Sequence, residues 1–183
     1  GAQLDVADKK GDTALMFAVE KGHFDIAKCL VDAKASIFLT NSAGNSALDI
    51  TLSKNDTAFT RLFASVSDKD GNTALCLAAQ SGADRVLKQL IAADVPLHDR
   101  NHAGNTPVML AVCHGDPVVV SALIDAGAVL DDRNEDGYTA AALATRLDNA
   151  AVLQVLLRAK ASCGVADSSG RTLLQLAVDG QHS

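Results

Sequence analysis

Short apolar stretches alternate with polar breaks along the whole chain. A stretch such as Ala14 to Val19 or Ala74 to Ala79 is followed by a break at Gly, Asn or Asp. A second apolar stretch then follows, with the spacing that suits one face of a helix. Stretches of this second kind cover residues 24–31, 86–91, 118–124 and 152–157. The pattern predicts pairs of short helices arranged in series.

A glycine that recurs at a nearly constant interval sets the phase of this pattern. The glycines are Gly11, Gly44, Gly71, Gly104, Gly137 and Gly170, at intervals of 33, 27, 33, 33 and 33 residues. Each ends a four-residue turn that opens with Asp8, Asn41, Asp68, Asn101, Asn134 or Asp167. Asp or Asn at the first turn position bonds to the backbone ahead, and Gly suits the last position. A fixed period of this length is the signature of a repeat architecture.

Helix start and stop signals stand at matching places in each unit. A hydroxyl that can cap the following helix comes two residues after the turn glycine, at Thr13, Ser46, Thr73, Thr106, Thr139 and Thr172. The second break falls at Gly22, Asn55, Gly82, Gly115 or Asp148, residue types that tolerate a left-handed C-cap. Pro107 and Pro117 stand where the first turn of a helix accepts proline. Each unit is therefore turn, helix, turn, helix.

The repeating pattern D-x-x-G-x-T-x-L-x-x-A-x-x-x-G resembles the ankyrin repeat, for example at residues 8–15 and 101–108. The resemblance covers essentially the whole chain and implies an all-α solenoid of L-shaped, stacked helix-turn-helix units joined by β-hairpin-type loops. It also implies a concave face of hairpin tips and first helices. The family's T-P-L-H histidine, which commonly ties repeats together, is replaced by Met16, Asp49, Cys76, Met109, Ala142 and Gln175. We therefore expect joints that rely on apolar stacking, and a lower stability than that of a consensus array.

The repeats predict a single domain over residues 1–183 with about five and a half units. Gly1 and Ala2 precede Gly11 at the spacing at which Gly127 and Ala128 precede Gly137, so the chain begins in the tail of a unit. Residues 173–178 read as a first helix without a second one. A solenoid normally ends in a polar capping unit. We therefore expect a segment of a longer array.

The second unit is six residues shorter than the others. The loss follows Phe63, where residues 64–67 replace the longer connection that covers residues 31–40 in the first unit. Each unit of a solenoid contacts only its neighbours. The deletion therefore predicts a bend, or an open step, between the second and third repeats.

Composition and charge exclude several classes of function. The chain has 48% hydrophobic and 21% charged residues and a net charge of −6, so it is a folded protein without the basic surface that nucleic acids require. It lacks an apolar run long enough to cross a bilayer. Its four cysteines form no C-x-x-C pair, which favours reduced thiols and a cytoplasmic or nuclear location. We expect a monomer.

The residue that follows each turn glycine changes in type in the last two repeats. The residue after the turn glycine is Asp12, Asn45, Asn72 and Asn105, and then becomes Tyr138 and Arg171. We expect Tyr138 to be exposed, and aromatic and Arg side chains are common anchors of interfaces. Arg100 and Arg133 precede consecutive turns and should lie close together, with Arg146 on the same face. His102 and His114 complete the predicted partner-binding set, which suits an acidic or extended peptide.

Other interpretations of these residues stay open. Asp131, Asp132, Glu135 and Asp136 are near in sequence and can neutralise the arginines, which would leave an ordinary solvated surface. His98, His102, Cys113 and His114 could converge on zinc, but they lack the short paired spacings of a structural site, so no metal is expected. No nucleophile elbow, phosphate loop or H-E-x-x-H motif is present, so no catalytic residue and no cofactor is expected.

The sequence thus predicts a non-catalytic protein–protein interaction module of the scaffold or adaptor type. The partner is expected on the concave face, and neither nucleic acid nor membrane insertion is expected. One alternative is a structural spacer or self-associating segment with no dedicated partner. Another is an autoinhibitory cover over an enzyme domain elsewhere in the full chain.

Overall fold

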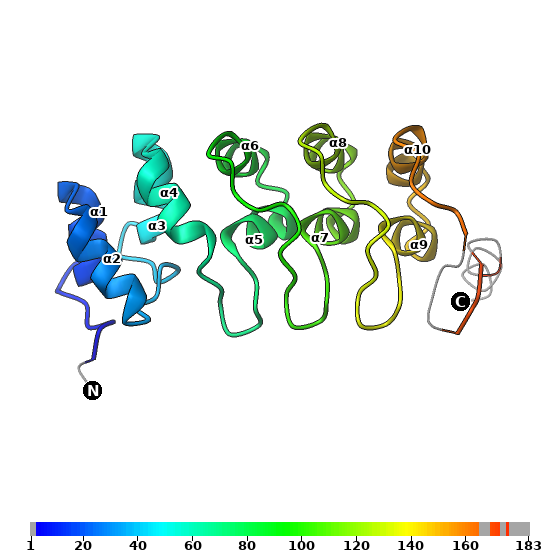
Figure 1. Cartoon of the computed structure of the whole chain (residues 1–183). Coiled ribbons are helices and arrows are strands. Elements are labelled where there is room, and N and C mark those ends of the chain that lie inside the picture. Colours follow the sequence, from blue (N-terminus) through cyan, green and yellow to red (C-terminus); the bar gives the residue numbers. More distant parts are fainter. Residues whose placement is uncertain (1–2, 165–168, 173–174, 176–183) are drawn as a thin grey trace.

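The computed structural model describes residues 3–164, 169–172 and 175, and within them the chain forms a row of helix pairs (Figure 1). First and second helices alternate, so each repeat contributes an odd- and an even-numbered helix. The helices are α1 (Ala14–Lys21), α2 (Phe24–Asp32), α3 (Ala47–Lys54), α4 (Thr57–Ala64), α5 (Ala74–Ser81), α6 (Asp84–Ala92), α7 (Pro107–His114), α8 (Pro117–Asp125), α9 (Ala140–Arg146) and α10 (Ala150–Arg158). The predicted all-α repeat solenoid is confirmed.

Hydroxyl caps start the first helices as the sequence predicts. The side chains of Thr13, Thr73 and Thr139 each accept a hydrogen bond from the backbone N–H three residues on. Ser46 forms a full capping box with Asp49. Left-handed residues follow the first helices at Gly22, Asn55, Gly82, Gly115 and Asp148, with φ between 53° and 91°. These positions fix the sharp turn into each second helix.

Thr106 departs from the capping pattern. It occupies the N-cap of α7, but its Oγ1 is buried and has no hydrogen-bond partner among the residues that the structure describes. We expect Thr106→Val to leave the free energy of unfolding within about 0.5 kcal/mol of the native value, because no bond is lost. The matched Thr73→Val change should cost about 1 kcal/mol, because it removes the bond from the N–H of Cys76. Urea unfolding of the two variants measures this difference, and equal losses would contradict it.

The core lies between the two rows of helices and is built from small aliphatic side chains. Residues 140–144 of α9 are all buried, and four of these five are alanine. The row of second helices contributes Leu87 and Leu90 of α6 and Leu123 of α8, which are completely buried. Alanine on the first helices lets the rows approach closely, so the stack is thin.

Hydrogen bonds between neighbouring hairpins hold most joints. The amide of Asn41 donates to Asp12 at 2.6 Å, and that of Asn134 donates to Asn105 at 2.9 Å. A backbone bond accompanies each such pair, as from the N–H of Glu135 to the carbonyl of Ala103. Asn101 and Asn72 form the same side-chain link between the third and fourth repeats. The turn asparagines therefore order the hairpins in register.

This ladder is interrupted between the second and third repeats. Within the described residues no such bond joins the hairpin that carries Gly44 to the one that carries Gly71. A Cβ built on Gly44 would meet no atom within 4 Å, whereas a Cβ on Gly11 or Gly104 would press against the backbone of the next hairpin. The expected open step is confirmed on the hairpin side.

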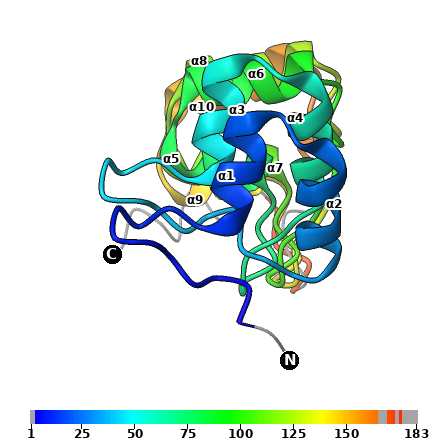
Figure 2. The same cartoon turned by 90° about the vertical axis from the view of Figure 1, so that its left-hand side faces the viewer.

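The outer side of the same joint is closed. Gln89 of α6 donates to the carbonyl of Leu52 at 3.0 Å, and Arg61 of α4 donates to the carbonyl of Ala93 at 2.8 Å. In Figure 1 the hairpins of the third to fifth repeats hang as parallel loops beneath α5, α7 and α9. Along the stack, α2 and α4 lie beside α6, α8 and α10 and not in front of them (Figure 2). The first two repeats are therefore turned against the last three.

Of the predicted first helix over residues 173–178, the structure describes Gln175 alone, which is helical, and it describes the turn opening at Asp167 from residue 169 onward. Among the helices that the structure describes, none is long and apolar enough to cross a membrane.

Candidate protein-binding surface

Arg100 and Arg133 lie close together, as expected from their equivalent positions. The Nη1 atom of Arg100 donates to the carbonyl of Arg133 at 2.5 Å and approaches that of Gly104 at 3.4 Å. Its Nη2 atom forms an ion pair with Asp132 at 2.7 Å. Arg133 donates to the carbonyl of Gly137 at 2.9 Å in its own hairpin. Both arginines thus stabilise hairpins, and an acidic neighbour partly neutralises Arg100.

Tyr138 is buried, so the expectation that it is exposed was wrong. Only 9% of its surface is accessible. The residue after the turn glycine faces the neighbouring hairpin, as Asn72 and Asn105 show by bonding to the next turn asparagine. The hydroxyl of Tyr138 accordingly accepts a hydrogen bond from Arg171 at 3.3 Å. The aromatic side chain replaces an amide link between hairpins.

Arg146 lies over the ring of Tyr138. The guanidinium carbon is 4.5 Å from the ring centroid, in the range of a cation–π contact. Arg146 stands at the end of α9, and Tyr138 at the base of the hairpin before it, so the pair lies where first helix and hairpin meet. Among the described residues, Arg146 has no carboxylate within ion-pair distance. Within this part of the chain it is a positioned cation without a counter-ion.

Cys113 of α7 lies within reach of this guanidinium. Burial raises the pKa of its thiol, and the positive charge of Arg146 offsets part of that rise. The side chains of two neighbouring first helices therefore share this part of the surface.

This proximity can be measured by alkylation. Arg146→Ala removes the charge that favours the thiolate, so the pKa of Cys113 should rise further. Below that pKa the thiolate fraction falls, and we expect alkylation of Cys113 by iodoacetamide to slow about two- to fivefold. Cys29, which is exposed in the first repeat, is the internal control in the same sample. An unchanged or faster rate at Cys113 would show that the two groups do not interact.

His102 and His114 are exposed, and each also packs against the preceding repeat. A Cβ on Gly71 would lie 2.6 Å from the imidazole of His102, and one on Gly82 would overlap that of His114. Glycine in the earlier repeat therefore makes room for histidine in the later one. The two rings are held in place with one side facing solvent.

Sequence comparison of the turn columns missed another column on the first helices. It lies four residues after each helix cap and is apolar throughout. Its members are Phe17, Ile50, Leu77, Leu110 and Leu143. Exposure decreases along the stack from 42% at Phe17 to 2% at Leu143. The regular spacing of these apolar residues in the sequence was the signal that could have identified them.

Within the part of the chain that the structure describes, no three His, Cys, Asp or Glu side chains group so that they could hold a metal ion.

Stacked helix pairs with projecting hairpins define a repeat solenoid. A family model described as ankyrin repeats (3 copies) matches residues 50–134 and 109–183, and one described as ankyrin repeats (many copies) matches residues 1–50. The chain belongs to the ankyrin repeat family. Such repeats are generally protein–protein interaction modules and are typically non-catalytic. No curated protein sequence matches the chain.

Proposed function

We propose that this chain is a non-catalytic binding module of the scaffold or adaptor type, acting in the cytoplasm or nucleus. Its partner lies on the concave face that the hairpin tips and first helices form at the fourth and fifth repeats. One observation carries the proposal: Arg146 is held over Tyr138 on that face, and no carboxylate of the described residues pairs with it. A guanidinium fixed in this way loses little freedom when it binds.

The partner suited to this surface is an acidic or extended peptide segment. Arg146 can form a bidentate pair with a carboxylate of the partner. His102 and His114 offer fixed imidazoles beside it. Arg100 and Arg133 keep the hairpins in register, and Tyr138 supports Arg146 from below. These six residues form the proposed surface, in which Tyr138 acts as a platform and not as the contact itself.

A capture experiment tests the proposal. The immobilised chain and an Arg146→Glu variant are incubated with lysate from the source cells, and retained proteins are identified by mass spectrometry. We expect a partner to be retained by the native chain and lost, by about tenfold or more, with Arg146→Glu, because attraction becomes repulsion.

The matched control is Arg158→Glu, which makes the same charge change at an exposed position at the end of α10. It should retain the partner at the native level, and circular dichroism should show unchanged helix content in both variants. Equal retention by Arg146→Glu and the native chain would contradict the proposed surface.

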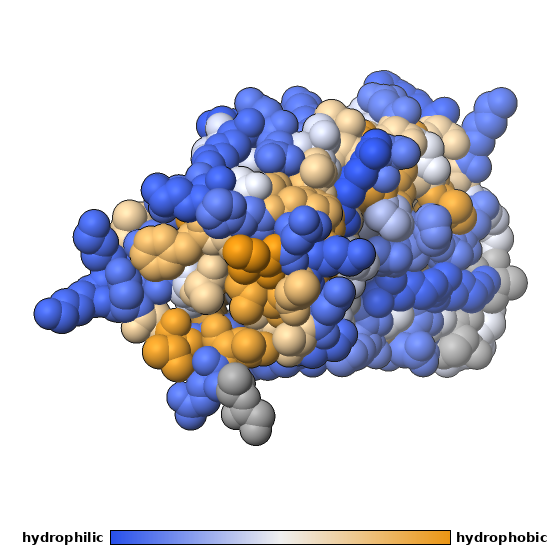
Figure 3. Space-filling view, turned by 60° about the vertical axis from the view of Figure 1, so that its left-hand side comes forward, coloured by the Kyte–Doolittle hydropathy of each residue, from blue (hydrophilic) through white to orange (hydrophobic). Residues whose placement is uncertain are grey.

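Self-association is the second candidate, because the first repeat exposes several large apolar side chains. Figure 3 shows apolar side chains gathered at the end of the stack that this repeat forms. The large apolar side chains exposed in the first repeat, and in the residues just before it, are those of Val6, Phe17, Phe24, Ile26 and Leu39. Sedimentation over a range of concentrations separates the candidates. Dimers without any captured partner would favour a self-associating spacer.

A further inference from the structure

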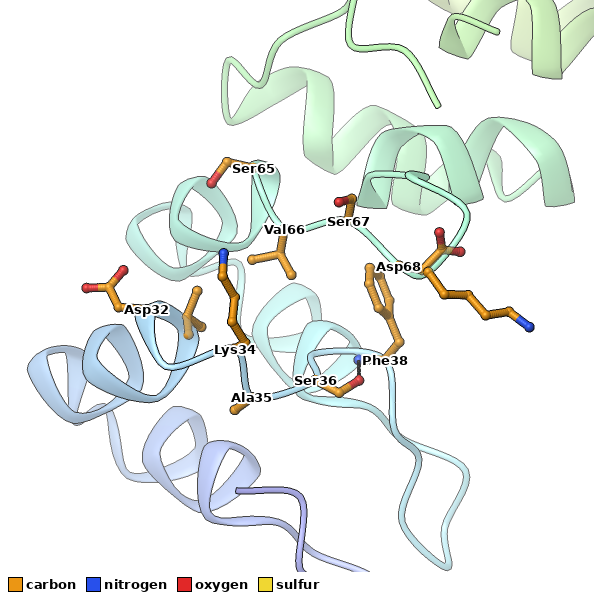
Figure 4. A pocket seen from close by; sticks show the side chains of 11 residues that line it. Asp32, Lys34, Ala35, Ser36, Phe38, Ser65, Val66, Ser67 and Asp68 are labelled. Carbon is orange, nitrogen blue, oxygen red and sulfur yellow. Dashed lines mark hydrogen bonds between the residues drawn. The ribbon is translucent and has the colours of Figure 1, made fainter. Parts of the chain in front are cut away.

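A pocket of about 510 Å³ opens between the arm of the first repeat and the short connection that joins the second repeat to the third. Its apolar lining includes Val31, Ala35, Phe38 and Val66. Figure 4 shows the side chains of Phe38, in the first repeat, and Val66, in the second, directed toward the same space. A pocket of this size falls in the range of ordinary ligand sites.

The pocket stands where the shortened repeat lacks a segment. In the other repeats an arm connects the second helix to the next turn, over residues 33–40, 93–100 and 126–133. After α4 only residues 65–67 separate the helix from the turn. One wall of the pocket is the arm of the first repeat, and the other is this short connection. The pocket therefore occupies the position of the arm that the second repeat lacks.

The complete arms show what such a segment supplies. Each carries two apolar side chains, separated by one residue, that turn toward the stack. They are Ala35 with Ile37, Val95 with Leu97, and Ala128 with Leu130, all of them buried or half-buried. Side chains two residues apart share one face of an extended chain. The natural occupant of the space is thus an extended segment with an apolar-x-apolar pattern.

Neighbouring arms also bond to each other where both are present. The N–H of Ser36 donates to Asp5 at 2.9 Å, and the N–H of Ser162 donates to Asp131 at 2.8 Å. Phe38 stands 33 residues after Asp5, at the acceptor position of the first arm. This position has an aromatic side chain, half-exposed in the pocket, where the next arm is missing. The apolar character of the site is therefore local to this joint.

The charges that line the pocket favour a segment in which an acidic residue stands beside the two apolar residues. Lys34 and Lys69 line it, and neither has an ion-pair partner among the described residues. Asp68 already accepts hydrogen bonds from Asp70 and Asn72. The carboxylate of Asp32 points away from the pocket in Figure 4. Lys69 interacts electrostatically with Asp68, which leaves Lys34 as the uncompensated cation of the lining.

We propose that this pocket is a docking site for an extended segment of a partner protein, which takes the place of the missing arm. The segment carries two apolar side chains separated by one residue, with an acidic residue beside them. The site lies between the arm of the first repeat and the connection from the second repeat to the third, and it is separate from the surface around Arg146, so it goes beyond the function proposed above.

The chain itself supplies a probe. A capped peptide with the sequence of residues 126–133 contains the apolar pair Ala128 and Leu130 followed by two aspartates. We expect the fluorescently labelled peptide to bind the 183-residue chain saturably in a polarisation titration, with a Kd below about 1 mM. A peptide with Ser in place of Leu130 should bind at least about tenfold more weakly, because a Leu-sized side chain is no longer buried.

Two variants of the chain locate the site. Phe38→Asp should weaken peptide binding at least about tenfold, and Leu39→Asp, at an exposed neighbour outside the pocket, should not. In an arm-filled variant the ten residues 124–133 replace residues 64–67. It should lose peptide binding and melt at a higher temperature. Arg146→Glu should bind the peptide as the native chain does, which separates this site from the surface on the fifth repeat.

Three results would overturn the proposal. The first is no saturable binding by the native chain, and the second is equal binding by Phe38→Asp. The third is a concentration-dependent dimer of the chain that Phe38→Asp dissociates, because the occupant would then be a second copy.

Discussion

Phe63→Ala is expected to unfold the first two repeats while the third to fifth stay folded. Phe63 is completely buried at the end of α4. Its ring packs edge-on to Phe59 at 6.3 Å, and Phe59 contacts Phe24 of α2 at 5.3 Å. Removing so large a side chain typically costs about 3–5 kcal/mol. The aromatic cluster joins the two second helices of the N-terminal half, so the loss falls there.

The open joint confines this loss. Stability in a solenoid is the sum of repeat and interface terms, and the interface between the second and third repeats lacks the hairpin bonds of the others. Hydrogen exchange followed by mass spectrometry should show lost protection over α1–α4 and retained protection over α5–α10. Phe17→Ala, at a residue that is 42% exposed, is the control and should change little. Loss of protection throughout the chain would contradict a weak joint.

The second large effect comes from paired glycine substitutions. Gly104 has φ of 73°, and a Cβ there would lie 2.8 Å from the backbone nitrogen of Glu135 in the next hairpin. Gly44 has nearly the same φ, 79°, but a Cβ there meets nothing within 4 Å. Gly44→Ala should therefore cost only backbone strain, about 1–2 kcal/mol. Gly104→Ala should cost about 2 kcal/mol more, because two hairpins must also separate.

The difference between these two variants measures the missing neighbour directly, since the residue change and the backbone conformation are matched. Urea unfolding, with exchange to assign the affected repeats, gives both free energies. If Gly44→Ala proves as costly as Gly104→Ala, the hairpin of the second repeat packs against a neighbour after all.

The fold was predictable because its signals are local and repeated. Turn glycines with positive φ, such as Gly71, and caps, such as Thr73, act within a few residues. Their spacing sets the boundaries of the repeats, and this does not depend on how the side chains pack. The step at the second joint was also predictable, because the length of the connection after Phe63 decides whether an arm can form.

The surface was less predictable because it depends on contacts between repeats. Sequence comparison identified the column of Tyr138 as unusual, but it could not show that this column faces the next hairpin. The ion pair between Arg100 and Asp132 depends on the stacking of two hairpins in the same way. Thr106 shows a further limit, since the side-chain hydroxyl of this correctly placed cap residue has no hydrogen-bond partner among the described residues.

Site-specific photo-cross-linking tests whether a partner binds the face of first helices and hairpin tips. A photoreactive amino acid replaces His114, on the proposed binding face, or Lys88, on the exposed side of the second helix α6. Each chain is irradiated with the partner that the native chain captures. We expect a cross-linked partner from position 114 and none from position 88. A partner that cross-links from position 88 and not from position 114 would contradict this expectation.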